Sequence, residues 1–107
     1  MSNPTVTIAG AGPSGLTLAW WLVEHGVNVT VLEREGSIPR DMRASTFHPA
    51  TLDLLMDSGL ADALVERGTV VPQWQYLIHE SGERAVFDMS CLGDVTAYPF
   101  RLQCEQF

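Results

Sequence analysis

The chain has 107 residues, of which 46% are hydrophobic and 18% charged; this composition suits one small globular domain and excludes a disordered segment. The formal net charge is −7, six arginines supply every formal positive charge, and lysine does not occur. The absence of lysine excludes a P-loop lysine and a lysine Schiff base, and the acidic balance argues against nucleic-acid binding, which needs a basic surface.

The longest apolar stretch, Leu16 to Val23, contains a threonine and is too short to cross a bilayer. The N-terminus lacks the basic region of a secretory signal. Cys91 and Cys104 form no CxxC pair, so the sequence predicts neither a zinc site nor a thioredoxin-like motif. We therefore expect a reduced, cytoplasmic setting, no membrane association and no bound metal.

The first third of the chain predicts a strand, a helix and a second strand in succession. Thr5 to Ala9 is rich in β-formers, and Pro13 fits the first turn of a helix, where its missing N–H costs nothing. Gly26 is placed to end that helix, and Val27 to Leu32 alternates β-branched residues as a strand does. This order is that of a βαβ unit with two parallel strands.

A glycine triplet and an acid accompany this unit. Gly10 permits a tight turn out of the first strand, Gly12 lets a pyrophosphate approach the backbone, and Gly15 allows close packing of the helix. Glu33 follows Gly15 by 18 residues, at the end of the second strand, where it can accept hydrogen bonds from a ribose. The helix N-terminus offers N–H groups to the phosphates, so the pattern predicts a dinucleotide site.

Two short helices are expected after a loop from Glu35 to Thr46. Pro49 opens the first, and Gly59 ends it. The second runs from Leu60 to Arg67 and is capped by Gly68. The inward-facing positions predicted from the apolar spacing are Leu52, Leu55 and Met56 in the first helix and Leu60, Ala63 and Leu64 in the second.

The last third predicts mainly extended structure. Val70 to Glu80 and Arg84 to Met89 read as strands joined by a two-residue turn at Ser81-Gly82, with a loop from Ser90 to Thr96 after them. Tyr98 to Leu102 is expected to be extended, but Pro99 argues against a central sheet position nearby. Gln103 to Phe107 resembles the first turn of a helix.

These elements predict an α/β fold: a Rossmann-like βαβ unit with an added β-hairpin and an incomplete sheet. An open α/β sheet usually has five or six strands and helices on both faces, more than this chain supplies. We therefore expect residues 1–107 to be the N-terminal part of a larger domain, or to need a second chain to complete the sheet.

Several motifs together resemble one family. GAGPSGL at Gly10 to Leu16, followed by Glu33-Arg34, resembles the phosphate loop and ribose acid of FAD-binding proteins. Further motifs resemble segments of the aromatic-ring hydroxylases: Arg43-Ala44, His48 to Leu55, Gly59-Leu60, and Leu102-Gln103 with Glu105. Over essentially all of its length the chain is similar to the first part of the group A flavoprotein monooxygenases, the p-hydroxybenzoate hydroxylase and phenol hydroxylase type.

The resemblance implies a role for each matching residue. Glu33 would bind the adenosine ribose, Arg34 would lie beside the adenine, Arg43 would reach the pyrophosphate or the flavin side, and Gln103 would hydrogen-bond the ribityl chain. An arginine fork suits a diphosphate, and an amide suits polyol hydroxyls. The candidate cofactor-binding residues are therefore Gly10, Gly12, Pro13, Ser14, Gly15, Glu33, Arg34, Arg43 and Gln103.

The implied function is the FAD-binding portion of an NAD(P)H-dependent monooxygenase that uses O2 to hydroxylate an aromatic or polyketide-like substrate. The family places a second ribityl-phosphate segment and the substrate domain further along, so this chain alone is expected to be inactive, and no catalytic residue is assigned. Structural roles, without contact to a cofactor, are expected for other residues: a helix start for His48, core or interface packing for Trp20 and Trp21, and inert thiols for both cysteines.

Three alternatives remain open. Another flavoprotein of the two-dinucleotide type, such as an amine oxidase or a geranylgeranyl-reductase-like enzyme, shares the glycine loop and the ribose acid. An NAD(P)-dependent dehydrogenase is conceivable because Arg34 follows Glu33, although Glu33 would repel a 2′-phosphate. The third alternative is a nucleotide-binding module without catalytic activity.

Overall fold

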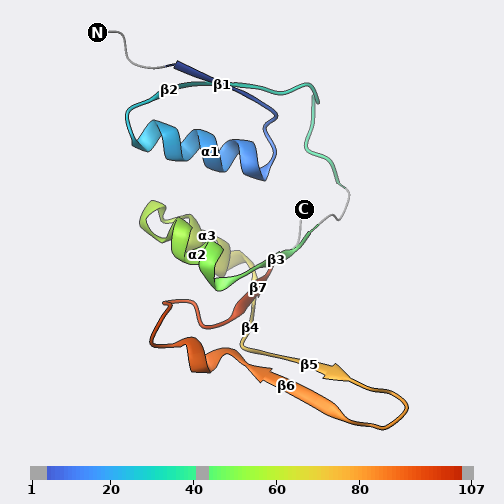
Figure 1. Cartoon of the computed structure of the whole chain (residues 1–107). Coiled ribbons are helices and arrows are strands. Elements are labelled where there is room, and N and C mark those ends of the chain that lie inside the picture. The colour runs from blue at the N-terminus through green and yellow to red at the C-terminus, as the bar shows by residue number, and fades with distance from the viewer. Residues whose placement is uncertain (1–4, 41–43, 105–107) are drawn as a thin grey trace. The chain divides into compact units, whose positions relative to one another are not determined.

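The computed structural model describes residues 5–40 and 44–104. The chain divides into two compact units, the first ending at Pro39 and the second beginning at Arg40 (Figure 1). The described residues form α-helices, strands and two 3-10 helices, η1 and η2: β1 (Thr5–Ala9), α1 (Pro13–Glu24), β2 (Asn28–Leu32), β3 (Thr46–Phe47), α2 (Pro49–Leu55), η1 (Met56–Ser58), α3 (Leu60–Arg67), β4 (Thr69–Val71), β5 (Gln73–Leu77), β6 (Arg84–Asp88), η2 (Met89–Leu92) and β7 (Arg101–Gln103).

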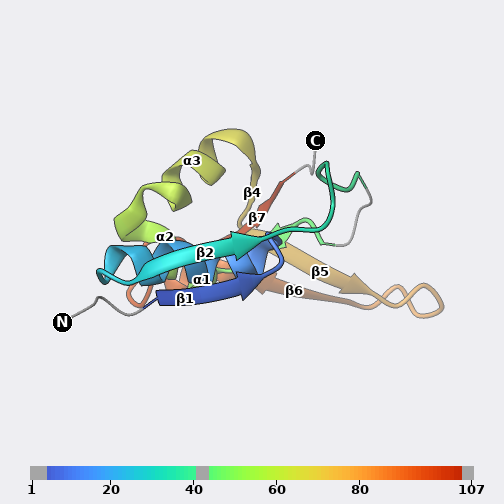
Figure 2. The same cartoon turned by 90° about the horizontal axis from the view of Figure 1, so that it is seen from above.

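The first unit is a strand, a helix and a strand, as predicted. β1 and β2 lie side by side and run in the same direction, with Thr5 opposite Asn28 and Ala9 opposite Leu32 (Figure 2). The connection between parallel strands must cross from one end of the sheet to the other, and α1 makes that crossing. α1 packs on both strands, and Ile8 of β1 is buried.

The ends of α1 follow the sequence signals. Pro13 occupies the first turn, and Gly26, in the left-handed region at φ 76°, donates its N–H to the carbonyl of Val23. Trp21, expected to serve in packing, is 42% exposed and stacks on His25. His25 Nδ1 also lies 2.7 Å from the Trp21 carbonyl oxygen, so this pair closes the end of the helix.

The second unit is built around a three-stranded antiparallel sheet in the order β3-β7-β4. Leu102 at the centre of β7 pairs with Phe47 on one side and Val70 on the other, and its side chain is fully buried. The expectation that Pro99 keeps its segment from a central position is therefore wrong. β7 begins at Arg101, so the proline lies outside the ladder and removes no hydrogen bond from it.

The structure corrects three core positions expected in this part of the second unit: Met56, Leu60 and Ala63. Leu52 and Leu55 of α2 are buried as predicted, whereas Met56 and Leu60 are 46% and 45% exposed. Ala61 is fully buried in place of Ala63, which is exposed. The reason is the break between α2 and α3: η1 and a left-handed Gly59 (φ 75°) turn the chain, so the apolar spacing of one helix does not continue into the next.

The expected strand from Val70 to Glu80 is two strands in different sheets. Pro72 separates β4, which pairs with β7, from β5, which pairs with β6 as an isolated hairpin. The predicted two-residue turn is wrong as well. The N–H of Ile78 bonds the carbonyl of Glu83, and the four residues enclosed by this bond, including a left-handed Gly82, form the turn.

Smaller differences occur at the ends of predicted segments. Thr46, expected in a loop, belongs to β3, and the predicted loop from Ser90 contains the end of η2. Gln103 lies in β7 rather than in a helix, and residues 105–107 lie outside the described residues. Over residues 5–40 and 44–104, no helix combines the length and the apolar character that a bilayer crossing requires. The observed fold is thus mixed α/β, with small separate sheets.

Gly68, at the end of α3, provides a test of this packing. A Cβ at this position would lie 2.7 Å from Leu102 Cδ1 and 2.9 Å from Cys104 Sγ. Because Leu102 is fully buried, it has little room to retreat. We expect Gly68→Ala to lower the free energy of unfolding by about 1–3 kcal/mol, measured by urea denaturation. Gly36→Ala is the matched control, since a Cβ there meets nothing within 4 Å. Equal stability of the two variants would contradict the packing.

Candidate functional site

The loop between β1 and α1 presents bare main chain. Gly10 has φ 103°, a conformation that side-chain-bearing residues rarely adopt, and Gly12 is the extended N-cap of α1. A Cβ built on either glycine meets no atom within 4 Å, so open space lies beside both. A ligand can therefore approach the backbone here closely.

Gly15 packs the helix against this loop. A Cβ at Gly15 would lie 2.0 Å from the carbonyl oxygen of Gly10 and 3.4 Å from the Ile8 side chain. A separation of 2.0 Å is well inside the contact distance of two heavy atoms, so a hydrogen atom alone fits at this position. The three glycines thus have the distinct conformational and steric properties that the sequence predicted.

The N-terminus of α1 is open to an anion. It carries no side-chain cap and no acidic residue in its first turn, and Pro13 and Ser14 are exposed. Leu16 is bonded to the Gly12 carbonyl, which starts the helical ladder. The first-turn N–H groups ahead of it carry the partial positive charge of the helix dipole.

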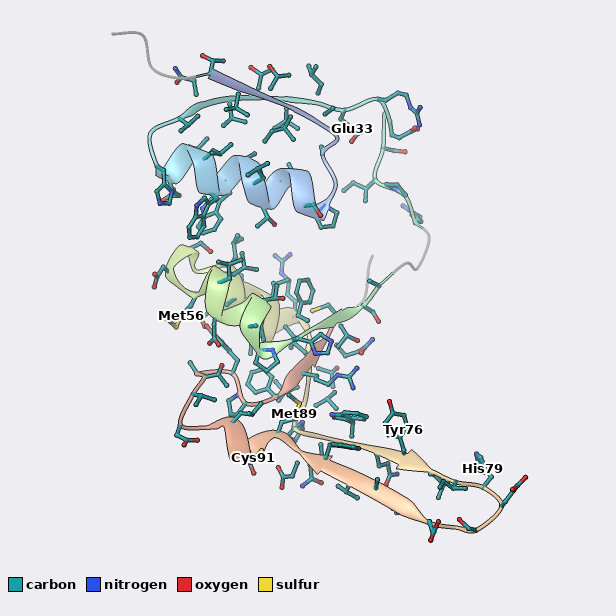
Figure 3. All side chains as sticks on the ribbon, in the orientation of Figure 1. Glu33, Met56, Tyr76, His79, Met89 and Cys91 are labelled. Atoms are coloured by element: carbon teal, nitrogen blue, oxygen red, sulfur yellow. The ribbon has the colours of Figure 1, made fainter. Side chains whose placement is uncertain are left out.

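Glu33 reaches back to the same loop from the end of β2 (Figure 3). Its Oε2 accepts a hydrogen bond from the Ala11 N–H at 2.7 Å, and its Oε1 accepts one from the Glu35 N–H at 2.8 Å. These backbone donors, that of Glu35 first and that of Ala11 second, hold the pKa of the Glu33 carboxyl below its ordinary value of 4.5. The carboxylate is thus charged at neutral pH and lies beside the glycine loop.

An open depression of about 570 Å³ adjoins Gly10 and Glu33. A volume of this size lies within the range of small-molecule sites. Arg34 lies on its rim, and its guanidinium pairs with the Glu35 carboxylate at 3.0 Å while remaining 93% exposed. Such a surface pair contributes about 0–1 kcal/mol and leaves the side chain free to rearrange. The lining residues are Ala9, Gly10, Leu32, Glu33, Arg34 and Glu35.

The second unit contains another depression of similar volume, lined by Asp53, Met56 and residues 93–97. Asp53 Oδ1 there accepts a hydrogen bond from the Thr96 hydroxyl at 2.8 Å. This bond joins α2 to the segment before β7 and gives Asp53 a structural role. Within residues 5–40 and 44–104, no residue predicted to bind a cofactor lines this depression.

Gln103 belongs to the second unit, in β7. Its Oε1 accepts a hydrogen bond from Thr46 Oγ1 at 2.9 Å, and its Nε2 donates to Ser45 Oγ. The side chain is exposed, and one hydrogen and one lone pair of the amide are left by these two bonds. Arg43 lies outside the described residues.

The structure therefore brings together the predicted residues of the first unit: the glycine loop, Pro13, Ser14, Glu33 and Arg34. Sequence reasoning missed Ala11, which contributes a backbone N–H rather than a side chain. The residue type does not reveal a backbone donor. The position of Ala11 between the first two glycines is the sequence feature that could have indicated it. Sequence reasoning also missed Ser45 and Thr46 as partners of Gln103, since 58 and 57 residues separate them from it.

The chain matches one protein family and is similar to several known enzymes. A family described as "FAD binding domain" matches residues 3–102. The chain is 43% identical over 105 residues to the 6-methylpretetramide 4-monooxygenase of Streptomyces rimosus, a match that covers 97% of the chain and 18% of that enzyme. It is 34% identical over 101 residues to the 6-hydroxy-3-succinoylpyridine 3-monooxygenase of Pseudomonas putida, covering 94% of the chain and 26% of that enzyme.

Solved structures give the same match. The p-nitrophenol 4-monooxygenase of Pseudomonas putida superposes with a TM-score of 0.82 at 34% identity, over 96% of the chain and 27% of that structure. Aklavinone-11 hydroxylase in complex with FAD and aklavinone superposes with a TM-score of 0.72 at 26% identity, over 98% of the chain and 22% of that structure. The chain thus spans between 18% and 27% of the length of these four proteins.

The low pKa of Glu33 predicts a pH dependence of stability. Since the folded state binds the Glu33 proton less tightly than the unfolded state, Glu33 stabilises the fold above pH 4.5, and this contribution is lost as the pH falls through the lowered value. The charged neighbours Arg34 and Glu35 pair with each other. Asp88, whose pKa is lowered chiefly by the Ser90 N–H, adds a contribution of the same sign.

We expect Glu33→Gln to lose less stability than the parent chain between pH 7 and pH 3, because the carboxylate contribution is already absent. The measurement is chemical denaturation at both pH values. Asp88→Asn, in the other unit, provides the comparison: combining the two substitutions should flatten the pH dependence further. An unchanged pH dependence in Glu33→Gln would contradict the hydrogen bonds assigned to its carboxylate.

Proposed function

The chain belongs to the FAD-binding domain family, and from this premise we propose that it is the FAD-anchoring, N-terminal part of an NAD(P)H-dependent flavoprotein monooxygenase. The observation that carries the proposal is the juxtaposition of bare main chain at Gly10 and Gly12, the open N-terminus of α1, and the Glu33 carboxylate. A Rossmann-like unit presents the same three features to a dinucleotide.

FAD fits this arrangement in its charge and its shape. Its diphosphate would lie against Gly10, Gly12 and the first turn of α1 at Pro13, Ser14 and Gly15, where no Cβ blocks the first two positions and the helix dipole favours an anion. Glu33 would accept hydrogen bonds from the adenosine ribose. Arg34, exposed and held by one surface ion pair, would swing over the adenine.

The second unit would contribute Gln103 and Arg43. The two bonds from Gln103 to Ser45 and Thr46 fix its amide, and the remaining donor and acceptor positions suit the hydroxyls of the ribityl chain. Arg43 would reach the pyrophosphate or the flavin. Bound FAD supplies the redox and oxygen-transfer chemistry, and this chain supplies the anchoring.

The substrate domain and the remaining parts of the cofactor site would come from further polypeptide, since the chain spans less than a third of the length of its relatives. Their names include p-nitrophenol and 6-methylpretetramide, which supports an aromatic or polyketide-like substrate and O2 as co-substrate. The same names favour a monooxygenase over a dehydrogenase or a non-catalytic module. We place the protein in the cytoplasm, where its cysteines, free in the structure, would remain reduced.

The direct test has two parts. The purified chain is titrated with FAD, and its melting temperature is then measured with and without FAD. We expect saturable binding and a rise in stability of about 2.7 kcal/mol when free FAD exceeds the dissociation constant a hundredfold. NAD and NADP serve as comparison ligands and should shift the melting temperature less than FAD does. An unchanged melting temperature at high FAD concentration, or a larger shift with NADP, would contradict the proposed function.

Gly12→Val tests where the diphosphate lies. A side chain at Gly12 would enter open space, so the fold should survive, but that space is where the diphosphate is proposed to approach. We expect saturable FAD binding to be abolished while the urea midpoint changes little. Gly36→Val is the matched control, since it adds the same side chain to open space elsewhere in the first unit and should leave FAD affinity intact. Normal FAD affinity in Gly12→Val would refute this placement.

A further inference from the structure

The carboxylate of Glu33 is bonded to the glycine loop itself. The donor is the N–H of Ala11, 22 residues earlier in the sequence, at 2.7 Å from Oε2. Ala11 lies between Gly10 and Gly12, the two positions where open space adjoins the backbone. One side chain at the end of β2 is thus attached to the middle of the proposed diphosphate loop.

The loop needs such an attachment because glycine restricts its own backbone weakly. Its start is fixed by the Gly10 N–H, which donates to the Leu32 carbonyl at 2.7 Å as a continuation of the β1–β2 pairing. Its end is fixed by the Leu16 N–H, which donates to the Gly12 carbonyl at 2.9 Å. Between these two backbone bonds, the Glu33 carboxylate holds Ala11.

We propose that Glu33 is a positioning residue for the diphosphate loop and sets the direction of the Ala11 peptide before any cofactor arrives. This role rests on the proposed function and is additional to the ribose contact assigned to Glu33 there. A loop that already has its bound shape avoids the entropic cost of ordering when the ligand binds.

The two roles of Glu33 are compatible in their hydrogen bonding. An ionised carboxylate has about four acceptor positions. The Ala11 and Glu35 N–H groups use one on each oxygen. The remaining acceptor capacity, part of which faces the Arg34 N–H, is available to a ribose hydroxyl, so the sugar can bind without displacing Ala11.

The Glu35 N–H contributes to this arrangement by fixing the second oxygen. Its bond of 2.8 Å to Oε1 orients the carboxylate plane, so that Oε2 faces Ala11. The Glu35 side chain itself points to Arg34, and its charge is partly balanced there. The lowered pKa of Glu33 agrees with these two hydrogen bonds, because both donors favour the charged form of the carboxyl group.

Glu33→Gln keeps the size of the side chain and removes one acceptor oxygen. Its amide NH2 cannot accept a hydrogen bond, so the variant can satisfy Ala11 or Glu35 but not both in the present geometry. Glu33→Asp keeps the charge on a side chain one methylene shorter, which withdraws the carboxylate from the loop. Asp88→Asn is the control, because that carboxylate accepts the Ser90 N–H in the second unit.

The experiment is amide hydrogen exchange by NMR on the ¹⁵N-labelled 107-residue chain without FAD. We expect the Ala11 amide to exchange about tenfold faster in Glu33→Gln, the effect of weakening a charge-assisted hydrogen bond, and to be unchanged in Asp88→Asn. Gly10 is the internal reference: its N–H bonds a backbone carbonyl and should keep its exchange rate. A merely structural role of Glu33 would accelerate Gly10 and Ala11 together.

An unchanged Ala11 rate in Glu33→Gln, or a parallel rise at Gly10, would overturn the proposal. If Glu33→Gln does not fold, Glu33→Asp takes its place with the same two criteria. Because exchange is measured without FAD, the outcome is separate from that of the FAD titration. A chain that fails to bind FAD but shows the selective Ala11 effect would refute the proposed function alone; a chain that binds FAD without that effect would refute the positioning role alone.

Discussion

The contact between Gly15 and the Gly10 carbonyl oxygen constrains the rest of the proposed site. A Cβ on residue 15 would lie 2.0 Å from that oxygen, so α1 begins as close to the preceding loop as main-chain atoms permit. This close approach brings the first turn of α1 to the ends of β1 and β2, where Glu33 lies. Gly10 and the Glu33 carboxylate border one depression, at the edge where open α/β sheets bind ligands, and α1 begins directly after Gly12.

An acid beside this site would repel an anionic ligand if its charge were not compensated by hydrogen bonds. Two backbone N–H groups accommodate the charge of Glu33, and Arg34 and Glu35 neutralise each other on the rim. The first-turn N–H groups of α1 are left for phosphate oxygens. Negative and positive ends of the site are thus separated, which matches a ligand with a neutral sugar at one end and a charged diphosphate next to it.

The first unit could be predicted closely because its signals are local. Strand, glycine loop and helix follow one another between Thr5 and Glu24, and each glycine has its own conformational or steric reason. The second unit depends on contacts between distant segments. β7 occupies the centre of its sheet by pairing with the strands that contain Thr46 and Thr69, which no spacing rule anticipates, and after the turn at Gly59 the buried position of α3 is Ala61 rather than Ala63. Ala11 was not predicted because its contribution is a backbone N–H, which almost every residue type can supply.

The measurement that tests the account most directly is the footprint of FAD on the amide spectrum of the labelled chain. We predict that the largest shifts fall on Gly10, Ala11, Gly12, Ser14 and Glu33, the residues that border the bare main chain and its carboxylate. Shifts confined to Asp53, Met56 and residues 93–97, around the other depression, would place the ligand elsewhere and contradict the account. A spectrum that does not respond to FAD would contradict it as well.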